Sequence, residues 1–389
     1  MQGASVFINN TSRGTTADKS GYFEITDVPA GKHELIISSI GYETTVYSFS
    51  AEALPVKLKV VLEVKVKELE NVIVEPSVEE GWNKWGKLFT DNFIGSTPNA
   101  AFCRIKNEKA IRFRHYKKSN RVIAYCDEPL IFENKALGYT IKYQLENFEV
   151  NFKEHSSAFS GYPFFEEIEK KRKGLQNKWR QKRDKAYYGS MMHFMRSLYL
   201  DSLHKEGFEV RRMVKVPNFE KQRVKRIYVP QWRPPGSSNV RVITTSSGMN
   251  IQAPQKIITD STLSADSVRY YERVLEQKDF NEVYGRAILT ADSLIVKTEN
   301  DYKILFFNDY LYITYKNEFE EEAYLRFYGE NRSVTFQRSL IWLTNSEGVG
   351  IYQNGTYYPP QSVYSMAYWG WSEKMADFLP VDYEPGNEP

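Results

Sequence analysis

Residues 1–76 alternate short apolar segments with turn signals, and this alternation constrains the fold more than any other feature of the chain. Phe23 and Ile25 alternate with polar neighbours, as in a strand with one buried face. Asp18 and Gly21 suit a hairpin turn, because Asp bonds backbone amides and Gly tolerates a positive φ. Several short strands at this spacing predict a small β-sandwich, a module that performs no chemistry by itself.

Four pieces of this region carry a resemblance. They are Val6-Phe7-Ile8, Thr15-Thr16-Ala17-Asp18-Lys19-Ser20-Gly21-Tyr22-Phe23, Val28-Pro29-Ala30-Gly31 and Ile40-Gly41-Tyr42. In this order they resemble the carboxypeptidase-regulatory-like family, a transthyretin-like sandwich of about seven strands. Members of that family begin one strand earlier. The resemblance therefore implies that the first strand, and an export signal with it, are missing from this sequence.

The segment after the sandwich extends the resemblance. Leu69-Glu70-Asn71-Val72-Ile73-Val74-Glu75-Pro76 is similar to the exit from this module in TonB-dependent receptors. A plug and a barrel follow in those receptors, but no run of alternating barrel strands with aromatic girdles follows here. The chain thus resembles the carboxypeptidase-like regulatory domain-containing proteins of Gram-negative envelopes. This resemblance implies a periplasmic or outer-membrane-associated protein.

The remaining chain predicts a second, larger domain. We expect a sandwich at 1–76, a linker or adapter helix at 77–100, and a β-rich domain at 101–389. Helical spacing within the linker is carried by Trp82, Trp85, Leu88 and Phe89. The large domain should contain a helical pair at about 163–206, with Pro163 opening the first helix. Residues 217–262, rich in Pro, Ser and Asn, predict an exposed loop.

The fold class predicted from these patterns is mainly β. A seven-strand-type sandwich is followed by an α+β domain, whose sheet is mostly antiparallel and carries the inserted helical pair. The length of 389 residues is enough for two or three domains. Cys103 and Cys126, on consecutive predicted strands, could form one disulfide or remain buried thiols, and the sequence leaves both open.

The sequence contains no strong catalytic signature. His-Glu-x-x-His, paired Cys-x-x-Cys, Gly-x-Ser-x-Gly and phosphate-loop motifs are all missing from it. His193 and His204 would lie on one predicted helix but roughly 16 Å apart, too far to share a metal. Glycosidase chemistry needs two carboxylates beside a cleft. The candidates for that role are Glu166, Glu167, Asp260 and Asp292. We therefore predict no catalytic residue, no metal and no cofactor.

A basic segment is the clearest outlier. Residues 170–185 contain nine Lys or Arg against one Asp, and a second basic stretch follows at 211–226. If these stretches meet they would attract anionic groups, whereas the alternative is a solvated helix face. The predicted partner-contact residues are Trp179, Arg180, Arg183, Arg211 and Arg212.

Together these observations favour a non-enzymatic binding or scaffold protein of the bacterial envelope. The sandwich would be a docking or spacer module, and the larger domain would contact an outer-membrane protein or a surface glycan. Anionic lipid headgroups are a further expected partner. Nucleic acid is not, because the net charge is only +3. The alternative is a carbohydrate- or peptide-acting hydrolase with the sandwich as accessory domain.

Overall fold

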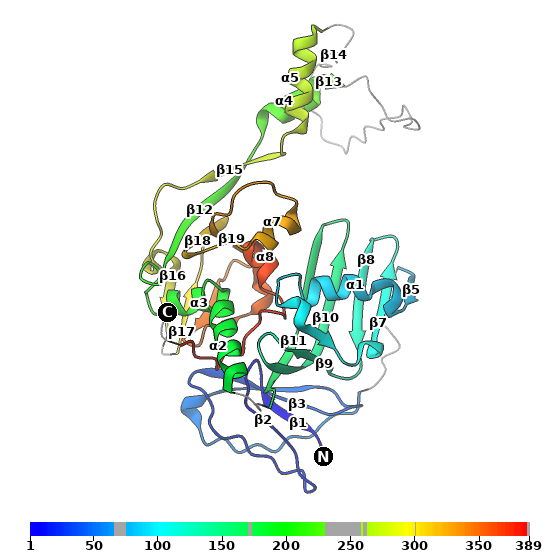
Figure 1. Cartoon of the computed structure of the whole chain (residues 1–389), viewed down its shortest axis with the longest axis vertical. Helices are drawn as coiled ribbons and strands as arrows, with labels where there is room; N and C mark the ends of the chain where they lie inside the picture. Colours follow the sequence, from blue (N-terminus) through cyan, green and yellow to red (C-terminus); the bar gives the residue numbers. More distant parts are fainter. Residues whose placement is uncertain (66–74, 170–172, 230–257, 260–262, 300, 387–389) are drawn as a thin grey trace. The chain divides into compact units, whose positions relative to one another are not determined.

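The computed structural model describes residues 1–65, 75–169, 173–229, 258–259, 263–299 and 301–386 (Figure 1). Two compact units make up the chain. The larger unit combines Met1–Arg211 with Ala287–Pro389, and the smaller unit is Arg212–Arg286. Antiparallel sheets dominate, which confirms the predicted mainly-β class. The proposed boundaries near residues 76 and 100 stay a prediction.

The N-terminal module is built on a four-stranded antiparallel sheet in the order β2-β1-β3-β4. Its strands are β1 Ser5–Ile8, β2 Gly14–Thr16, β3 Lys32–Ser38 and β4 Thr45–Ser50. One face buries Val6, Ile8, Leu35 and Ile37. Half-buried side chains from 23–28 and 58–62 pack on that face. Phe23 and Ile25 are among them, so the predicted inward alternation is confirmed.

A seven-stranded sheet follows in the order β5-β7-β8-β10-β9-β6, with β11 also paired to β10. Its strands are β5 Ser77–Glu80, β6 Cys103–Ile105, β7 Ile111–Tyr116, β8 Arg121–Cys126, β9 Leu130–Asn134, β10 Tyr139–Asn151 and β11 Ser156–Glu167. Helix α1, Trp82–Phe93, packs on this sheet (Figure 1). Its Phe89 is buried against Phe113. The amphipathic helix predicted in the linker region is therefore confirmed.

The helical insert begins later than predicted, because residues 163–167 continue strand β11. Pro163 lies opposite Tyr143 of β10, and its carbonyl oxygen accepts a hydrogen bond from Asn10 N–H on the other side of the strand. The N and O of one residue point to the same side of a strand. The missing N–H of Pro163 therefore faces away from β10 and costs no bond to it. The prediction that a helix starts at Pro163 is therefore wrong.

The N-terminal module covers the free edge of β11. Asn10 N–H donates to the Pro163 oxygen at 2.9 Å, and Phe165 N–H donates to the Thr11 oxygen at 3.0 Å. The rings of Phe7 and Phe164 pack beside these bonds, with centroids 5.2 Å apart. Backbone groups that an open edge would expose are therefore paired.

Two helices follow β11 and confirm the predicted pair. They are α2 Lys173–Tyr187 and α3 Met191–Tyr199. Gly189 turns the chain between them with φ of 76°, and the Ser190 hydroxyl caps α3 by accepting the His193 N–H. Because α3 ends at Tyr199, His204 does not share a helix with His193, and that prediction is wrong.

The second core of the larger unit lies around α3 and two further sheets. One holds β18 Tyr310–Phe319, β19 Phe336–Leu343 and β22 Val363–Ala367, and the other holds β16 Ile295–Thr298, β17 Tyr302–Leu305, β20 Val349–Tyr352 and β21 Tyr357–Tyr358. Three short helices are α6 Ala291–Leu294, α7 Glu322–Tyr328 and α8 Tyr368–Ser372. Phe194 and Leu198 of α3 are fully buried in this core.

The smaller unit starts within strand β12, Phe208–Pro217. Its other elements are α4 Phe219–Ile227, β13 Tyr228–Val229, β14 Ile258–Thr259, α5 Ala265–Glu276 and β15 Phe280–Tyr284. The loop predicted to begin at residue 217 is wrong in its first part, where the chain forms helix α4. Asn218 starts this helix, because its side chain accepts the Lys221 N–H as an N-cap. Most of that predicted loop, 230–257, lies outside the described residues.

Candidate functional site

Trp179, a predicted contact residue, is buried inside the larger unit. Trp179 belongs to α2 and is only 5% exposed. Its indole N–H donates to the Lys135 carbonyl oxygen at 2.9 Å. A Cβ on Gly138 would lie 2.2 Å from the indole ring, so the helix packs directly on the turn before β10. Trp179 is therefore a packing residue and not an exposed aromatic anchor.

Arg183 is also placed inside the protein, contrary to its predicted surface role. It is 7% exposed, and its Nε donates to the Leu137 carbonyl oxygen at 2.7 Å. Its Nη1 donates to Glu167 at 2.7 Å, and the guanidinium lies 3.9 Å from the centre of the Tyr139 ring. The chain's own acceptors thus compensate the cost of burying this charge.

The other three predicted residues lie at separate places. Arg180 is exposed on α2. Arg211 is half-buried, and its Nε donates to Glu209 at 2.9 Å. Arg212 is exposed and belongs to the smaller unit. A joint surface made from the two basic stretches stays a prediction.

Helix α2 nevertheless presents cations to solvent. Lys178, Lys182 and Lys185 are exposed and recur at i, i+4 and i+7, which places them on one side of the helix. Lys185 bonds Glu321 at 2.7 Å, whereas Lys178 and Lys182 form no ion pair within the described residues. We call these three residues the basic α2 face. Arg180 lies on another side of the helix, because it is two positions after Lys178 and positions i and i+2 are about 200° apart around the helix axis.

The interior face of α2 carried a signal that sequence reasoning missed. Trp179, Arg183 and Tyr187 recur every four residues, and all three are buried. The Arg in the middle hid an otherwise regular apolar stripe within a basic segment. Two aromatic residues eight apart were the available sign that this side faces the core.

A cavity of about 70 Å³ lies between α2, α8, β18 and β19. Its lining includes four carboxylates and two lysines, which are Glu318, Glu321, Glu373, Asp377, Lys182 and Lys185. Asp377 accepts hydrogen bonds from the Thr97 hydroxyl at 2.5 Å and from the Asn99 amide at 2.6 Å. Glu373 accepts the Met191 N–H at 2.9 Å. Glu318 accepts the Gln337 amide at 3.0 Å.

Burial shifts the titration of these carboxylates toward neutral pH. It raises the pKa of Glu373 to about 7, against the opposing hydrogen bond from Met191. It likewise raises the pKa of Asp377 to about 6, although Thr97 and Asn99 stabilise the charged form. Burial also raises the pKa of Glu318. Perturbed acids that line one cavity are a common sign of a functional site.

Glu373 should make the stability of the larger unit depend on pH. The folded group keeps its proton up to a pKa of about 7, whereas an unfolded Glu loses it near 4.5. Between these values the folded state binds more protons, so rising pH lowers the free energy of unfolding, by at most about 1.4 kcal/mol per pH unit for one group. Glu373→Gln should remove this share of the slope in urea unfolding across the window. The exposed Glu347→Gln is the control, and equal slopes for wild type and Glu373→Gln would contradict the assignment.

His193 has a structural role. Burial lowers its pKa to about 4, so the imidazole is neutral. Gly189 N–H donates to Nδ1 at 3.2 Å, which leaves the proton on Nε2, 3.3 Å from Glu206. No three His, Cys, Asp or Glu side chains of the described residues are grouped so that they could hold a metal ion.

Of the carboxylates singled out for hydrolysis, the three that the structure describes do not line the cavity. Glu166 bonds Lys142 at 2.7 Å, Glu167 bonds Arg183, and Asp292 is exposed on α6. Asp260 lies outside the described residues. Cys103 and Cys126 are both free thiols, on strands β6 and β8 that are not neighbours. Among the described helices, none has the length and apolarity to cross a membrane.

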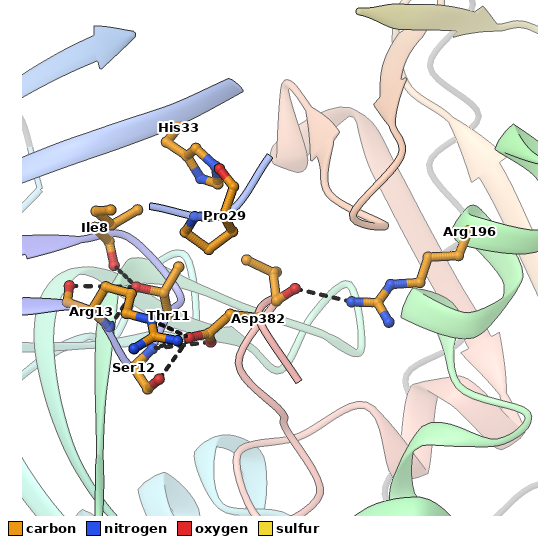
Figure 2. Close-up of polar contacts among 9 residues, drawn as sticks. Ile8, Thr11, Ser12, Arg13, Pro29, His33, Arg196 and Asp382 are labelled. Carbon is orange, nitrogen blue, oxygen red and sulfur yellow. Dashed lines mark hydrogen bonds and ion pairs between the residues drawn. The ribbon is translucent and has the colours of Figure 1, made fainter. Parts of the chain in front are cut away.

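The C-terminal segment joins the N-terminal module to α3 (Figure 2). Asp382 accepts the Ser12 N–H at 3.0 Å and the Ser12 hydroxyl at 2.6 Å, and Arg13 Nε lies 3.5 Å away. The neighbouring Val381 N–H donates to the Asn10 oxygen at 2.7 Å. Close by, His33 Nε2 lies 2.8 Å from the Pro29 oxygen and fixes the turn between them.

Arg196 of α3 holds the other side of this segment. Its guanidinium donates to the carbonyl oxygens of Val381 at 2.9 Å, Tyr383 at 3.1 Å and Asn354 at 3.0 Å. Figure 2 shows Arg196 extending toward this segment from one side, while Asp382 points toward Ser12 on the other. We call residues 381–383 with Ser12, Arg13 and Arg196 the C-terminal clamp.

Residues 1–74 match the family model of the CarboxypepD_reg-like domain. This confirms the family predicted from the sequence motifs of the sandwich. Searches among curated proteins and among solved structures found no match to the chain. The clamp therefore ties a CarboxypepD_reg-like domain to the core of the larger unit.

Removing the Asp382 carboxylate should loosen the CarboxypepD_reg-like domain. Asp382→Ala leaves the Ser12 N–H and Arg13 without their acceptor, at an expected cost of about 2 kcal/mol. Asp382→Asn keeps one acceptor oxygen for Ser12 and should cost less. Urea midpoints and the rate of proteolysis within residues 1–65 measure both effects. Equal stability of Asp382→Ala and wild type would contradict the clamp.

Proposed function

We propose that this chain is a non-enzymatic binding protein of the bacterial cell envelope, located in the periplasm or at the outer membrane. Its CarboxypepD_reg-like domain serves as a spacer or docking module. The rest of the larger unit contacts an acidic surface of an outer-membrane protein or a surface glycan. Anionic lipid headgroups are a further source of the same negative charge.

The basic α2 face is the observation that carries this proposal. Lys178 and Lys182 hold their charges in solvent, without an ion pair within the described residues. Long exposed lysines steer association with a negatively charged surface and gain little inside the protein itself. Of the aromatic and guanidinium groups predicted to make this contact, Trp179 and Arg183 are buried inside the protein. Contact through this face is therefore mainly electrostatic.

The clamp supports the spacer role of the CarboxypepD_reg-like domain. Asn10, Ser12 and Arg13 are bonded to residues far along the chain, and Thr11 is bonded to β11. A module attached at several points holds one position on the larger unit, whereas a module on a free linker would not. A fixed position suits a spacer that sets the distance between two attachment points.

The hydrolase alternative has weaker support. The cavity does gather carboxylates, including Glu373 and Asp377. Its volume of about 70 Å³ is small beside the roughly 300–1,000 Å³ that ligand pockets usually have. A sugar ring or a peptide segment needs more room than this. The cavity therefore favours a small group over a hydrolysable polymer.

Capture of partners from detergent-solubilised envelopes tests the proposal. The tagged full chain is compared with the variant Lys178→Glu/Lys182→Glu and with the matched control Lys117→Glu/Lys118→Glu, whose lysines are exposed on the turn after β7. We expect one stoichiometric partner for wild type and control, reduced about tenfold or more for the α2 variant and weakened by salt. Equal capture by all three proteins would contradict a role for the α2 face. Adding anionic vesicles or free glycan as competitors identifies the source of the charge.

A further inference from the structure

We propose that the cavity between α2, α8, β18 and β19 binds a small cationic donor group, a primary ammonium or a guanidinium. The cavity borders the basic α2 face and shares Lys182 and Lys185 with it, but here the proposed ligand is a cation bound by carboxylates, whereas that face is proposed to contact an anionic surface. The ligand could be a free amine or the end of a Lys or Arg side chain from a partner polypeptide.

The polar atoms of the cavity favour a hydrogen-bond donor. Glu373 uses one carboxylate oxygen to accept the Met191 N–H, and Glu318 uses one to accept Gln337. Within the described part of the chain, the second oxygen of each has no hydrogen-bond donor. Asp377 is satisfied by Thr97 and Asn99. Two open acceptors therefore remain on Glu373 and Glu318.

Asn99 gives a second and independent indication. It lines the cavity and is 8% exposed, and its amide N–H₂ already donates to Asp377. Its Oδ1 is buried and has no hydrogen-bond partner among the residues that the structure describes. Leaving a buried carbonyl oxygen unpaired costs about 1–3 kcal/mol. A donor bound beside it would remove this cost.

The charge balance leaves the site negative. Lys185 is bonded to Glu321 at 2.7 Å, which neutralises one pair. Of the remaining charged residues that line the cavity, Lys182 is the one cation and Glu318, Glu373 and Asp377 are the three acids. The neighbouring Lys374 does not line the cavity, and burial lowers its pKa. A bound cation reduces this negative charge once the acids lose their protons.

The size of the cavity limits the ligand to a few atoms. A water molecule needs about 10–15 Å³ of cavity volume, so this cavity of about 70 Å³ has room for roughly five water molecules. An ammonium group with a short alkyl chain, or a guanidinium group, fits this size.

Calorimetric titration of the full chain with n-butylammonium tests the proposal. We expect saturable binding near neutral pH, with proton release seen as a dependence of the heat on the ionisation enthalpy of the buffer. Proton release follows because a cation favours the charged form of Glu373 and Glu318. n-Butanol, which is similar in size but uncharged, should not bind.

Two isosteric variants assign the site. Glu373→Gln keeps an acceptor for Met191, and Glu318→Gln serves if the first variant fails to fold. Either should weaken binding about tenfold or more and reduce proton release, whereas the exposed Glu347→Gln should bind like wild type. Absence of binding, or equal binding by the wild type and both cavity variants, would overturn the proposal.

Comparing ligands distinguishes the two sources of the cation. A capped peptide with one central Lys that binds more tightly than n-butylammonium assigns the site to a partner side chain. Equal or tighter binding of the free amine assigns it to a small molecule. Partner capture in envelope extracts measures a separate property, so failure of one proposal does not decide the other.

Discussion

Trp179→Ala is expected to destabilise the larger unit by about 3–5 kcal/mol, the usual cost of emptying a buried Trp site. The indole fills the space against Gly138 and donates to the Lys135 oxygen. Truncation leaves a cavity and an unpaired carbonyl at the junction of α2 with the sheet. Urea unfolding followed by far-UV circular dichroism measures the loss.

Trp179→Phe is the matched control. It keeps an aromatic ring but loses the N–H, and should cost about 1–2 kcal/mol. If Trp179 were instead a partner anchor, Trp179→Ala would lower capture from envelopes with unfolding unchanged. That outcome would contradict the buried position of Trp179, which is 5% exposed.

Arg196→Met is expected to destabilise the larger unit by about 3 kcal/mol or more. The guanidinium donates to three carbonyl oxygens in two segments, those of Asn354, Val381 and Tyr383. Methionine fills similar space but leaves these acceptors without donors. Each carbonyl oxygen that water does not reach should then cost about 1–3 kcal/mol of stability. Because Val381 and Tyr383 flank Asp382, the C-terminal clamp should open as well. The urea midpoint and proteolysis of the C-terminal segment measure both effects.

Arg196→Lys keeps the charge but cannot reach all three oxygens, so its loss should be intermediate. The double variant Arg196→Met/Asp382→Ala tests the clamp as one device. Both residues hold the same short segment, so the combined loss should be smaller than the sum of the single losses. Strict additivity would mean that the two contacts are independent.

Periodicity and turn chemistry predicted most of the β structure. Strand β8 is an example, because Arg121–Cys126 alternates cleanly between buried and half-buried positions. Helix α1 was visible from the spacing of its aromatic residues. The start of the helical insert was missed, because Pro163 is favoured both in a first helical turn and on an edge strand. Only the position of β11 at an edge decides between them.

The candidate sites were harder to predict. Basic composition located α2, but which of its residues face the core depends on the turn at 135–138. Trp179 and Arg183 bond carbonyl oxygens of that turn that lie 44 and 46 residues earlier in the chain, so the contact exists only after folding. The cavity brings together residues from Thr97 to Asp377, and no local pattern indicates that they converge. The clamp joins Ser12 to Asp382 across nearly the whole chain for the same reason.

The most direct test of the proposed function is photo-crosslinking from the basic α2 face in intact envelopes. A photoreactive residue at Gln181, exposed on that side of α2, is compared with one at Lys117, exposed on the turn after β7. The proposal predicts a single adduct of defined mass from position 181, lost when Lys178→Glu and Lys182→Glu are added, and none from position 117. No adduct from position 181, or the same adducts from both positions, would contradict it.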